Sequence, residues 1–171
     1  HLPTRFAAQR KIPTQSLPQA EDKLALLQLA ITHFSGAGYQ CIGMDHFALK
    51  SDAMYQAFQQ GSLHRNFMGY TASKTQLMIG LGLSSISDSW YSFAQNVKTI
   101  EEYYECLEQN EIPVVKGHVL SQEDLIIRKH ILNLMCSFTT SWADEHMQFA
   151  EIDAVLEQLK EISQDQLIKI A

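Results

Sequence analysis

Histidine and carboxylate side chains are the groups in this sequence that could take part in acid–base chemistry. Asp45 and His46 are neighbours in the chain, and together they supply a carboxylate and an imidazole. Both fall in a segment with the composition of a β-strand, where successive side chains point to opposite faces. The pattern therefore favours separate, hydrogen-bonded structural roles for the two residues over a cooperating acid–base pair.

Metal binding is a second chemistry that the residue types allow. Three histidines could in principle supply ligands: His46, His64 and His118. No two of them have the spacing of neighbours on one helix face or one strand face, and the sequence contains no HExxH motif. A metal site built by this chain is therefore disfavoured.

The cysteines are few and far apart: Cys41, Cys106 and Cys136. An odd number of cysteines, set among apolar residues, indicates reduced thiols in a core and not a disulfide framework.

Two further patterns could contact a ligand. Gly80-x-Gly82 could let a cofactor approach the backbone closely, but two glycines without a third favour a bulged strand. Arg128-Lys129-His130 could clamp a substrate carboxylate, yet its place in the middle of a predicted helix favours a solvated face. The chain also lacks a GxSxG nucleophile elbow and a GxxxxGKS/T phosphate loop. These residues alone leave the function undecided.

Periodicity and capping signals predict the helices that would position these side chains. Thr99-x-x-Glu102 and Ser121-x-x-Asp124 resemble capping boxes, each followed by an apolar run. The expected helices cover residues 21–35, 52–60, 99–107, 121–138 and 149–162. Strands are expected over residues 39–48, 64–72, 77–86, 90–94 and 114–115.

This order of elements predicts an α+β fold. We expect a small, mostly antiparallel sheet flanked by helices, followed by a helical C-terminal region. Residues 1–20 hold three of the four prolines and are expected to form an irregular, partly helical connection. The predicted boundary near Lys116-Gly117 gives an α+β segment at 1–117 and a helical region at 118–171.

Composition excludes several classes of partner. The net charge is −6, and lysines and arginines are scattered along the chain, so nucleic-acid and anionic-membrane binding are disfavoured. No run approaches the ~18–20 apolar residues of a membrane span. We expect a cytoplasmic protein, and because the first residue is His1 and not Met, a fragment of a longer chain.

Several ordered blocks resemble one enzyme family. The most discriminating is LHRNFMGYT at residues 63–71, which is close to the family's LHRNFQGYTT. The other blocks are HLPT at 1–4, FAAQRK at 6–11, Gly38-Tyr39, IGMDHFA at 42–48, GLGLSSIS at 80–87 and AQN at 94–96. The chain resembles the C-terminal part of the oxygen-independent coproporphyrinogen III oxidases.

The resemblance implies a fragment of a partial (β/α) barrel radical-SAM enzyme. Family members carry a CxxxCxxC loop that binds a 4Fe–4S cluster, and the cluster, supplied by an electron donor, reduces S-adenosylmethionine to a radical. The radical starts the oxidative decarboxylation of two propionates of coproporphyrinogen III to vinyls, giving protoporphyrinogen IX in haem biosynthesis. The three cysteines here have the wrong spacing for the cluster. No cofactor is therefore expected on this chain alone, which is also expected to be inactive.

One residue of this sequence matches a cofactor contact of the family. By resemblance, Ile86 would touch the cluster-bound S-adenosylmethionine, and no residue here is expected to be catalytic or to bind metal. The sequence departs from the family pattern at Met68, where glutamine is usual, and at Lys74-Thr75-Gln76, where the family has Gly-Asp-x-Asp.

Two alternatives to an oxidase segment remain open at this point. The departures motivate a haem- or tetrapyrrole-binding paralogue without oxidase activity. The apolar helical segment 122–162 motivates a self-standing interaction module. An upstream CxxxCxxC motif would support either radical-SAM reading, and its absence would favour the module.

Overall fold

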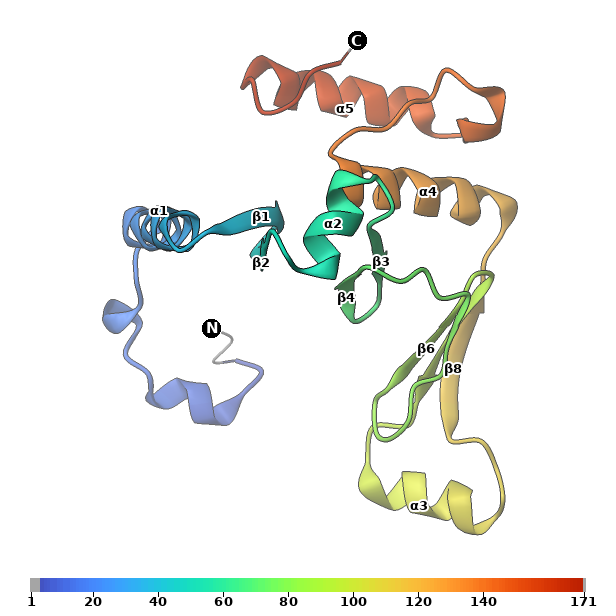
Figure 1. Cartoon of the computed structure of the whole chain (residues 1–171). Helices are drawn as coiled ribbons and strands as arrows, with labels where there is room; N and C mark the ends of the chain where they lie inside the picture. Colours follow the sequence, from blue (N-terminus) through green and yellow to red (C-terminus); the bar gives the residue numbers. More distant parts are fainter. Residues whose placement is uncertain (1–3, 171) are drawn as a thin grey trace. The chain divides into compact units, whose positions relative to one another are not determined.

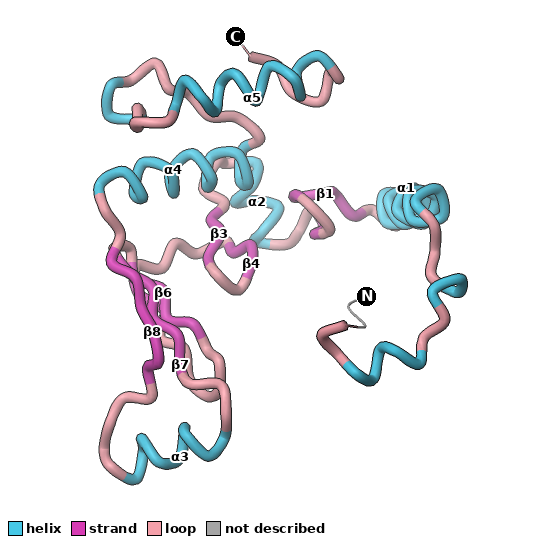
Figure 2. Tube along the Cα trace, turned by 180° about the vertical axis from the view of Figure 1, so that it is seen from behind, coloured by secondary structure: helices cyan, strands magenta, loops and turns pink. Residues whose placement is uncertain are grey.

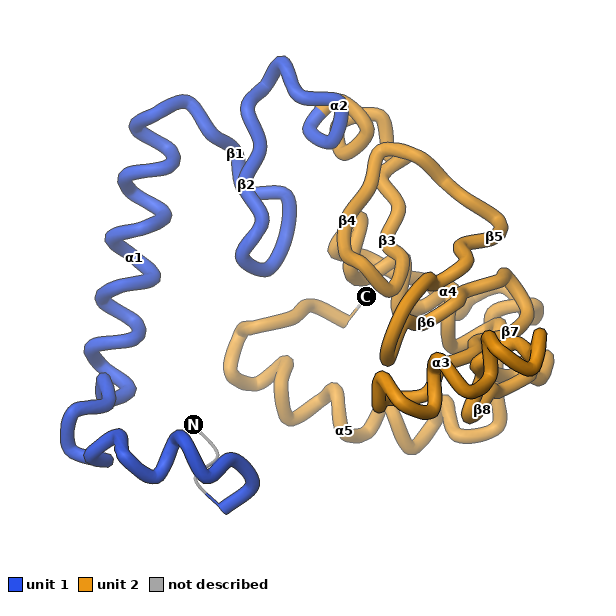
Figure 3. Tube along the Cα trace, turned by 90° about the horizontal axis from the view of Figure 1, so that it is seen from below, with its two compact units in different colours: residues 1–55 blue, residues 56–171 orange. Residues whose placement is uncertain are grey.

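The structure, a computed structural model, describes residues 4–170. The opening residues His1-Leu2-Pro3 of the first resemblance block lie outside the described residues. The chain divides into two compact units, residues 1–55 and 56–171 (Figure 3). The predicted boundary between 1–117 and 118–171 falls inside a strand of the second unit, and as a functional division of the chain it stays a prediction.

The first unit begins with two short 3-10 helices, Ala7–Lys11 and Thr14–Ser16, as expected for an irregular, partly helical segment. The long helix α1 (Ala20–Gly36) follows (Figure 1). At its start, the Asp22 carboxylate accepts a hydrogen bond from the backbone N–H of Gln19 at 3.0 Å. At its end, Gly38 adopts a φ of 87°, a conformation that favours glycine.

A hairpin of β1 (Tyr39–Gly43) and β2 (His46–Leu49) completes the first unit. The sequence predicted one strand over 39–48, and this was wrong because the chain turns at Met44, whose φ is 50°. The Phe34 ring of α1 stacks on Phe47 with centroids 4.8 Å apart. Ile42 in β1 is fully buried, so the small core of this unit lies between α1 and the hairpin.

Helix α2 (Ala53–Gln59) leads into a second hairpin, β3 (His64–Asn66) with β4 (Gly69–Thr71). This was also predicted as one strand, over 64–72. At the turn, the Asn66 side chain accepts a hydrogen bond from the N–H of Met68 at 2.9 Å, an Asx-type turn that reverses the chain.

The second unit contains a four-stranded antiparallel sheet (Figure 2). Its strands, in spatial and chain order, are β5 (Leu77–Met78), β6 (Ile86–Ser89), β7 (Ser92–Asn96) and β8 (Val114–Val119). The predicted strand over 77–86 is therefore two short strands joined by the glycine-containing segment. Helix α3 (Ile100–Glu108) connects β7 to β8.

Two helices follow the sheet: α4 (Gln122–Ser137) and, after the 3-10 helix Glu145–Met147, α5 (Ile152–Gln164). Ser121 caps α4 by accepting a hydrogen bond from the N–H of Asp124 at 3.1 Å, as predicted. Tyr70 donates its hydroxyl to the carbonyl of Met135 at 2.8 Å, which ties the β3–β4 hairpin to α4.

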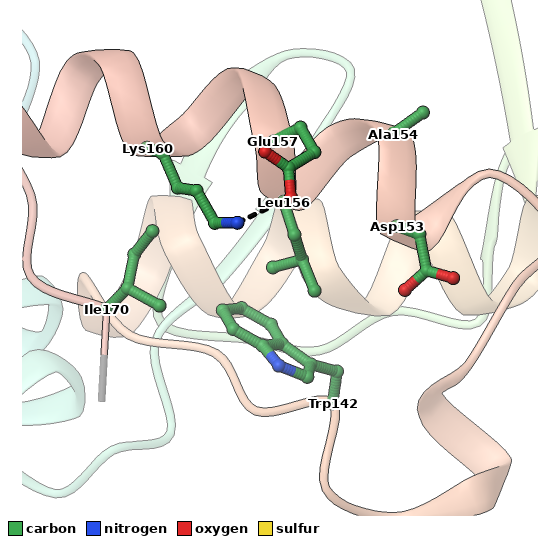
Figure 4. A pocket seen from close by; sticks show the side chains of 7 residues that line it. All are labelled: Trp142, Asp153, Ala154, Leu156, Glu157, Lys160 and Ile170. Atoms are coloured by element: carbon green, nitrogen blue, oxygen red, sulfur yellow. Dashed lines mark hydrogen bonds and ion pairs between the residues drawn. The ribbon is translucent and has the colours of Figure 1, made fainter.

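Helix α5 is amphipathic and carries part of its apolar side over Trp142. Figure 4 shows the Trp142 ring beneath Leu156, with Ile170 closing one end and the Lys160–Glu157 ion pair above. The α+β fold with small antiparallel sheets, flanking helices and a helical C-terminal region is thus confirmed. None of the helices within residues 4–170 combines the length and the apolarity needed to cross a bilayer.

Candidate functional site

Ile86 is the first residue of β6 and pairs with Gln95 of β7. Its half-buried side chain lines a surface cavity of about 390 Å³. Phe67 and Phe93 extend the apolar wall, and Lys116 and His118 of β8 supply polar groups. An apolar wall beside exposed strand backbone and a few polar groups is the usual character of a site for a small organic molecule.

Gly80 fixes the backbone of Ile86. A Cβ atom on Gly80 would lie 2.8 Å from the carbonyl oxygen of Ile86 and 2.9 Å from its nitrogen, so only glycine fits this approach. The N–H of Gly80 donates to Ser87 Oγ at 3.0 Å. Of the predicted glycine pair, Gly80 therefore serves close packing of the backbone, whereas Gly82 adopts a φ of 91° with no close backbone neighbour; β5 ends before both.

The same segment is bonded from the other side. Asn96, which is 5% exposed, donates its Nδ2 to the carbonyls of Gly80 at 3.2 Å and Gly82 at 2.9 Å. The N–H of Gly82, whose φ is 91°, donates to the Tyr103 hydroxyl at 3.2 Å. Buried polar groups that are all bonded in this way hold a single conformation, so the start of β6 is rigidly placed.

A buried ion pair anchors the other end of β6. Arg128 Nη2 lies 2.8 Å and 3.1 Å from the two carboxylate oxygens of Asp88. The two side chains are 14% and 6% exposed, respectively. Arg128 Nη1 also donates to the carbonyl of Ser89 at 3.1 Å. Helix α4 is thereby joined to the strand that carries Ile86.

The interpretation of residues 128–130 as a solvated helix face was wrong for two of the three. The Arg128 guanidinium lies over the rings of Trp90 and Phe93, 5.0 Å and 5.1 Å from their centroids. His130 is buried, with Nδ1 2.8 Å from Thr140 Oγ1 and Nε2 2.7 Å from the carbonyl of Met147. Lys129 is exposed, as predicted.

Asp45 and His46 are closer than strand alternation predicted. Asp45 lies in the turn between β1 and β2, and its Oδ1 is 2.9 Å from His46 Nδ1. The two side chains are 86% and 40% exposed. An ion pair between side chains as exposed as these contributes little to stability.

The histidines and cysteines stay apart. Within residues 4–170, no three histidine, cysteine or acidic side chains form a group that could hold a metal ion. His118 Nε2 lies 3.2 Å from Asp124 Oδ2, and hydrogen bonds from Ser121 hold the pKa of that carboxyl below its usual range. Cys41 is exposed, so the expectation of core thiols is wrong for this residue, whereas Cys136 is buried.

Similarity to known proteins extends along the whole chain, in sequence and in fold. No protein-family model matches the chain. The oxygen-independent coproporphyrinogen III oxidase of Salmonella typhimurium is 40% identical over 176 aligned positions, covering 100% of this chain and 38% of the relative. The enzyme of the same name from Synechocystis is 43% identical over 141 residues, covering 82% of this chain and 30% of the relative.

The fold comparison agrees. A solved structure described as coproporphyrinogen III oxidase (HemN) from Escherichia coli, a radical SAM enzyme, aligns with a TM-score of 0.88 and 37% identity. The alignment covers 100% of this chain and 41% of that one. The chain belongs to the oxygen-independent coproporphyrinogen III oxidase family. It spans about a third of the length of the curated relatives it matches, which is consistent with the predicted resemblance to one part of the oxidase.

Sequence reasoning missed Asp88, Asn96 and the anchoring role of Arg128. Asp88 and Arg128 are 40 positions apart, and no local pattern indicates that two such residues meet. For Asn96, the family block AQN at 94–96 was the available signal, but it named no partner for the side chain.

Proposed function

We propose that this chain is a segment of an oxygen-independent coproporphyrinogen III oxidase that decarboxylates two propionates of coproporphyrinogen III to vinyls. The observation that carries the proposal is the agreement of sequence and fold with family members along the full chain, including 37% identity to a radical SAM oxidase at a TM-score of 0.88. In this proposal the substrate is the porphyrinogen, and the segment shapes one wall of the cofactor pocket.

Ile86 is the residue we assign to S-adenosylmethionine. Its position in the GLGLSSIS block matches the family contact, and its surroundings suit an adenosine group: Phe67 and Phe93 are apolar, and the cavity of about 390 Å³ is open. When bound, the cofactor would supply the radical that removes hydrogen from a propionate. The role of this chain's residues is to bind and orient, because β6 is held at both ends by Gly80 and the Asp88–Arg128 pair.

The 4Fe–4S cluster does not fit this segment. A cluster of this type needs cysteine thiolates gathered at one point, whereas Cys41, Cys106 and Cys136 lie on separate elements and form no metal-binding group among the described residues. We therefore place the cluster, and the site that receives electrons from a donor, on sequence that precedes this chain in the full-length enzyme. The proposed compartment is the cytoplasm, where thiols stay reduced.

The test uses the full-length enzyme, reconstituted with iron and sulfide under anaerobic conditions. We expect it to convert coproporphyrinogen III to protoporphyrinogen IX. Ile86→Thr keeps the branch at Cβ but replaces the ethyl group with a hydroxyl. S-adenosylmethionine should therefore bind roughly five- to tenfold more weakly, because about 1 kcal/mol of apolar contact is lost.

The matched control is Ile79→Thr, because Ile79 is 67% exposed and carries the same side chain. It should leave cofactor binding unchanged. Equal binding by the two variants would remove Ile86 from the cofactor site, and an iron-loaded enzyme without turnover would contradict the oxidase assignment itself.

A second candidate function is haem or tetrapyrrole handling without oxidase chemistry. Met68, the residue that replaces the usual glutamine, lies at the β3–β4 turn and is 83% exposed. An exposed thioether is able to coordinate haem iron. Absorption spectra of the full-length protein with added haem, before and after Met68→Gln, would separate this candidate from the oxidase.

A further inference from the structure

The second unit contains another cavity, with a volume of about 420 Å³, in which Ile86 takes no part. One wall is a face of α4, where Lys129, Leu132 and Cys136 recur at three- and four-residue spacing. The opposite wall is formed by His64 at the start of β3, Lys74 in the loop after β4, and Trp90 in the turn after β6.

The lining of the cavity combines buried apolar side chains, uncharged polar groups and two lysines. Leu63 and Cys136 are 8% and 7% exposed. Lys74 and Lys129 also line it and are exposed, and the described residues that line it include no carboxylate. Neither lysine forms an ion pair within residues 4–170. An amphipathic cavity with unbalanced positive charge is suited to an anion that carries an apolar group.

The behaviour of His64 supports a positive potential in this cavity. Burial lowers the pKa of His64, and the positive charges of Lys74 and Arg128 lower the pKa further. Asp88 acts in the opposite direction, but its carboxylate is bonded to Arg128. The imidazole of His64 therefore holds its proton less tightly than a free histidine does, and of these three charges only that of Lys74 lacks a counter-ion among the described residues.

Trp90 is also pre-arranged. The ammonium group of Lys74 lies 4.8 Å from the centroid of the Trp90 ring, and the guanidinium of Arg128 lies 5.0 Å from it. His64 is stacked against the same ring, with centroids 6.5 Å apart. These contacts hold the indole in place, which reduces the entropy that a ligand would lose on ordering it.

We propose that this cavity binds an organic carboxylate, with the carboxylate group held by Lys74 and Lys129 and the apolar body against Trp90 and Leu132. The proposal goes beyond the oxidase reaction and requires neither S-adenosylmethionine nor a cluster.

Trp90 provides the readout. The 171-residue sequence has two tryptophans, so Trp142→Phe leaves Trp90 as the only indole of the 171-residue chain. The probes are 4-phenylbutyrate and its neutral amide, 4-phenylbutyramide, which differ only in the charged group. We expect saturable change of Trp90 fluorescence with the carboxylate, and binding roughly tenfold weaker with the amide.

Substitutions of Lys74 and Lys129 test whether these two positive charges hold the carboxylate of the probe. Lys74→Met and Lys129→Met should each weaken 4-phenylbutyrate binding roughly two- to fivefold, as expected for partly exposed ion pairs. Lys98→Met, at an exposed lysine outside the cavity, makes the same change in net charge and should have no effect. Lys74→Arg should retain binding, and unchanged thermal unfolding of each variant shows that the fold is intact.

Three results would overturn the proposal: no saturable change with 4-phenylbutyrate, equal affinity for the amide, or equal weakening by Lys98→Met. Full displacement of the probe by a similar concentration of inorganic phosphate would show a general anion site, which contradicts the apolar half of the proposal. The binding experiment contains neither iron nor S-adenosylmethionine. A negative result in it therefore leaves the oxidase assignment untouched.

Discussion

Helices α1 and α4 are almost equal in length, at 17 and 16 residues, but the structure holds them by different means. Helix α4 carries two buried side chains, His130 and Cys136, and its Arg128 is bonded to Asp88 on the sheet. Helix α1 has no buried residue, and its Leu24 is 66% exposed. The difference shows that amphipathic sequence alone does not provide a partner surface: α4 has one within its own unit, whereas the apolar side of α1 is largely uncovered by the described residues of unit 1.

The largest effect is expected from breaking the anchor of α4. Arg128→Met leaves the Asp88 carboxylate, which is 6% exposed, without its counter-ion. Removing one partner of a buried ion pair costs about 3–5 kcal/mol, and chemical denaturation should show a loss in this range. Adding Asp88→Asn to Arg128→Met should recover part of the loss. A loss below about 1 kcal/mol, typical of a surface pair, would show that α4 is held mainly by its apolar contacts.

A smaller effect is expected at the glycine beside Ile86. Gly80→Ala puts a Cβ 2.8 Å from the Ile86 carbonyl oxygen, and because backbone must move, the free energy of unfolding should fall by about 1–3 kcal/mol. Gly36→Ala in α1 is the matched control, since nothing lies within 4 Å of its added Cβ. It should be neutral or stabilising by up to about 1 kcal/mol. Equal losses at the two sites would contradict the close approach.

The next effect is a pH dependence of the second unit. The pKa of His64 is lowered in the folded chain, so the unfolded chain takes up the proton first as the pH falls below 6.5. Stability present above this value should therefore be lost on going to lower pH. Unfolding measured at decreasing pH should show this slope, and His64→Gln should reduce it. Because Lys74 contributes to the shift, Lys74→Met should raise the pKa of His64 in an NMR titration; an unchanged value would argue against the field of Lys74.

The smallest effect is expected on α1. Leu24→Gln replaces an exposed apolar side chain and should change the stability of the 171-residue chain by no more than about 0.5 kcal/mol. Sedimentation should be compared with that of the unsubstituted chain. A loss above this value would show that another part of the protein covers α1. A variant that dissociates where the unsubstituted chain associates would show that a second copy covers it, and either result would remove the contrast with α4.

The helices were predictable because their signals are local. Capping boxes at Thr99 and Ser121 and apolar spacing in residues 21–35 belong to single stretches of chain, and α1, α3 and α4 follow them. The strands over 39–48 and 64–72 were predicted as single elements, and each is a hairpin. Their turns use Met44 at a φ of 50° and the Asn66 side chain. Methionine gives no turn signal, whereas Asn66 is a turn-forming residue that was a signal available in the sequence.

Only part of the candidate site could be predicted from the sequence. Ile86 was assigned through resemblance to the family, and its role stays a proposal. The contacts that place it could not be derived, because Gly80 meets Ile86 across a loop and Arg128 meets Asp88 across 40 positions. Pairings of this kind depend on how strands and helices pack, which residue types alone do not specify.

By itself, the sequence determined the helices, the α+β class and, through its ordered blocks, the family. Helix signals and sequence blocks similar to those of the family each lie within short stretches of the chain, so both can be recognised without coordinates. Only the tertiary structure decided that Gly80 supports Ile86, that Arg128 is a buried anchor, and that Lys74, Trp90 and Lys129 share one cavity. The physical reason is that these contacts join different elements, from Gly80 and Ile86 on either side of a loop to Asp88 and Arg128, which are 40 positions apart. Burial, charge and close approach arise only after such elements have met.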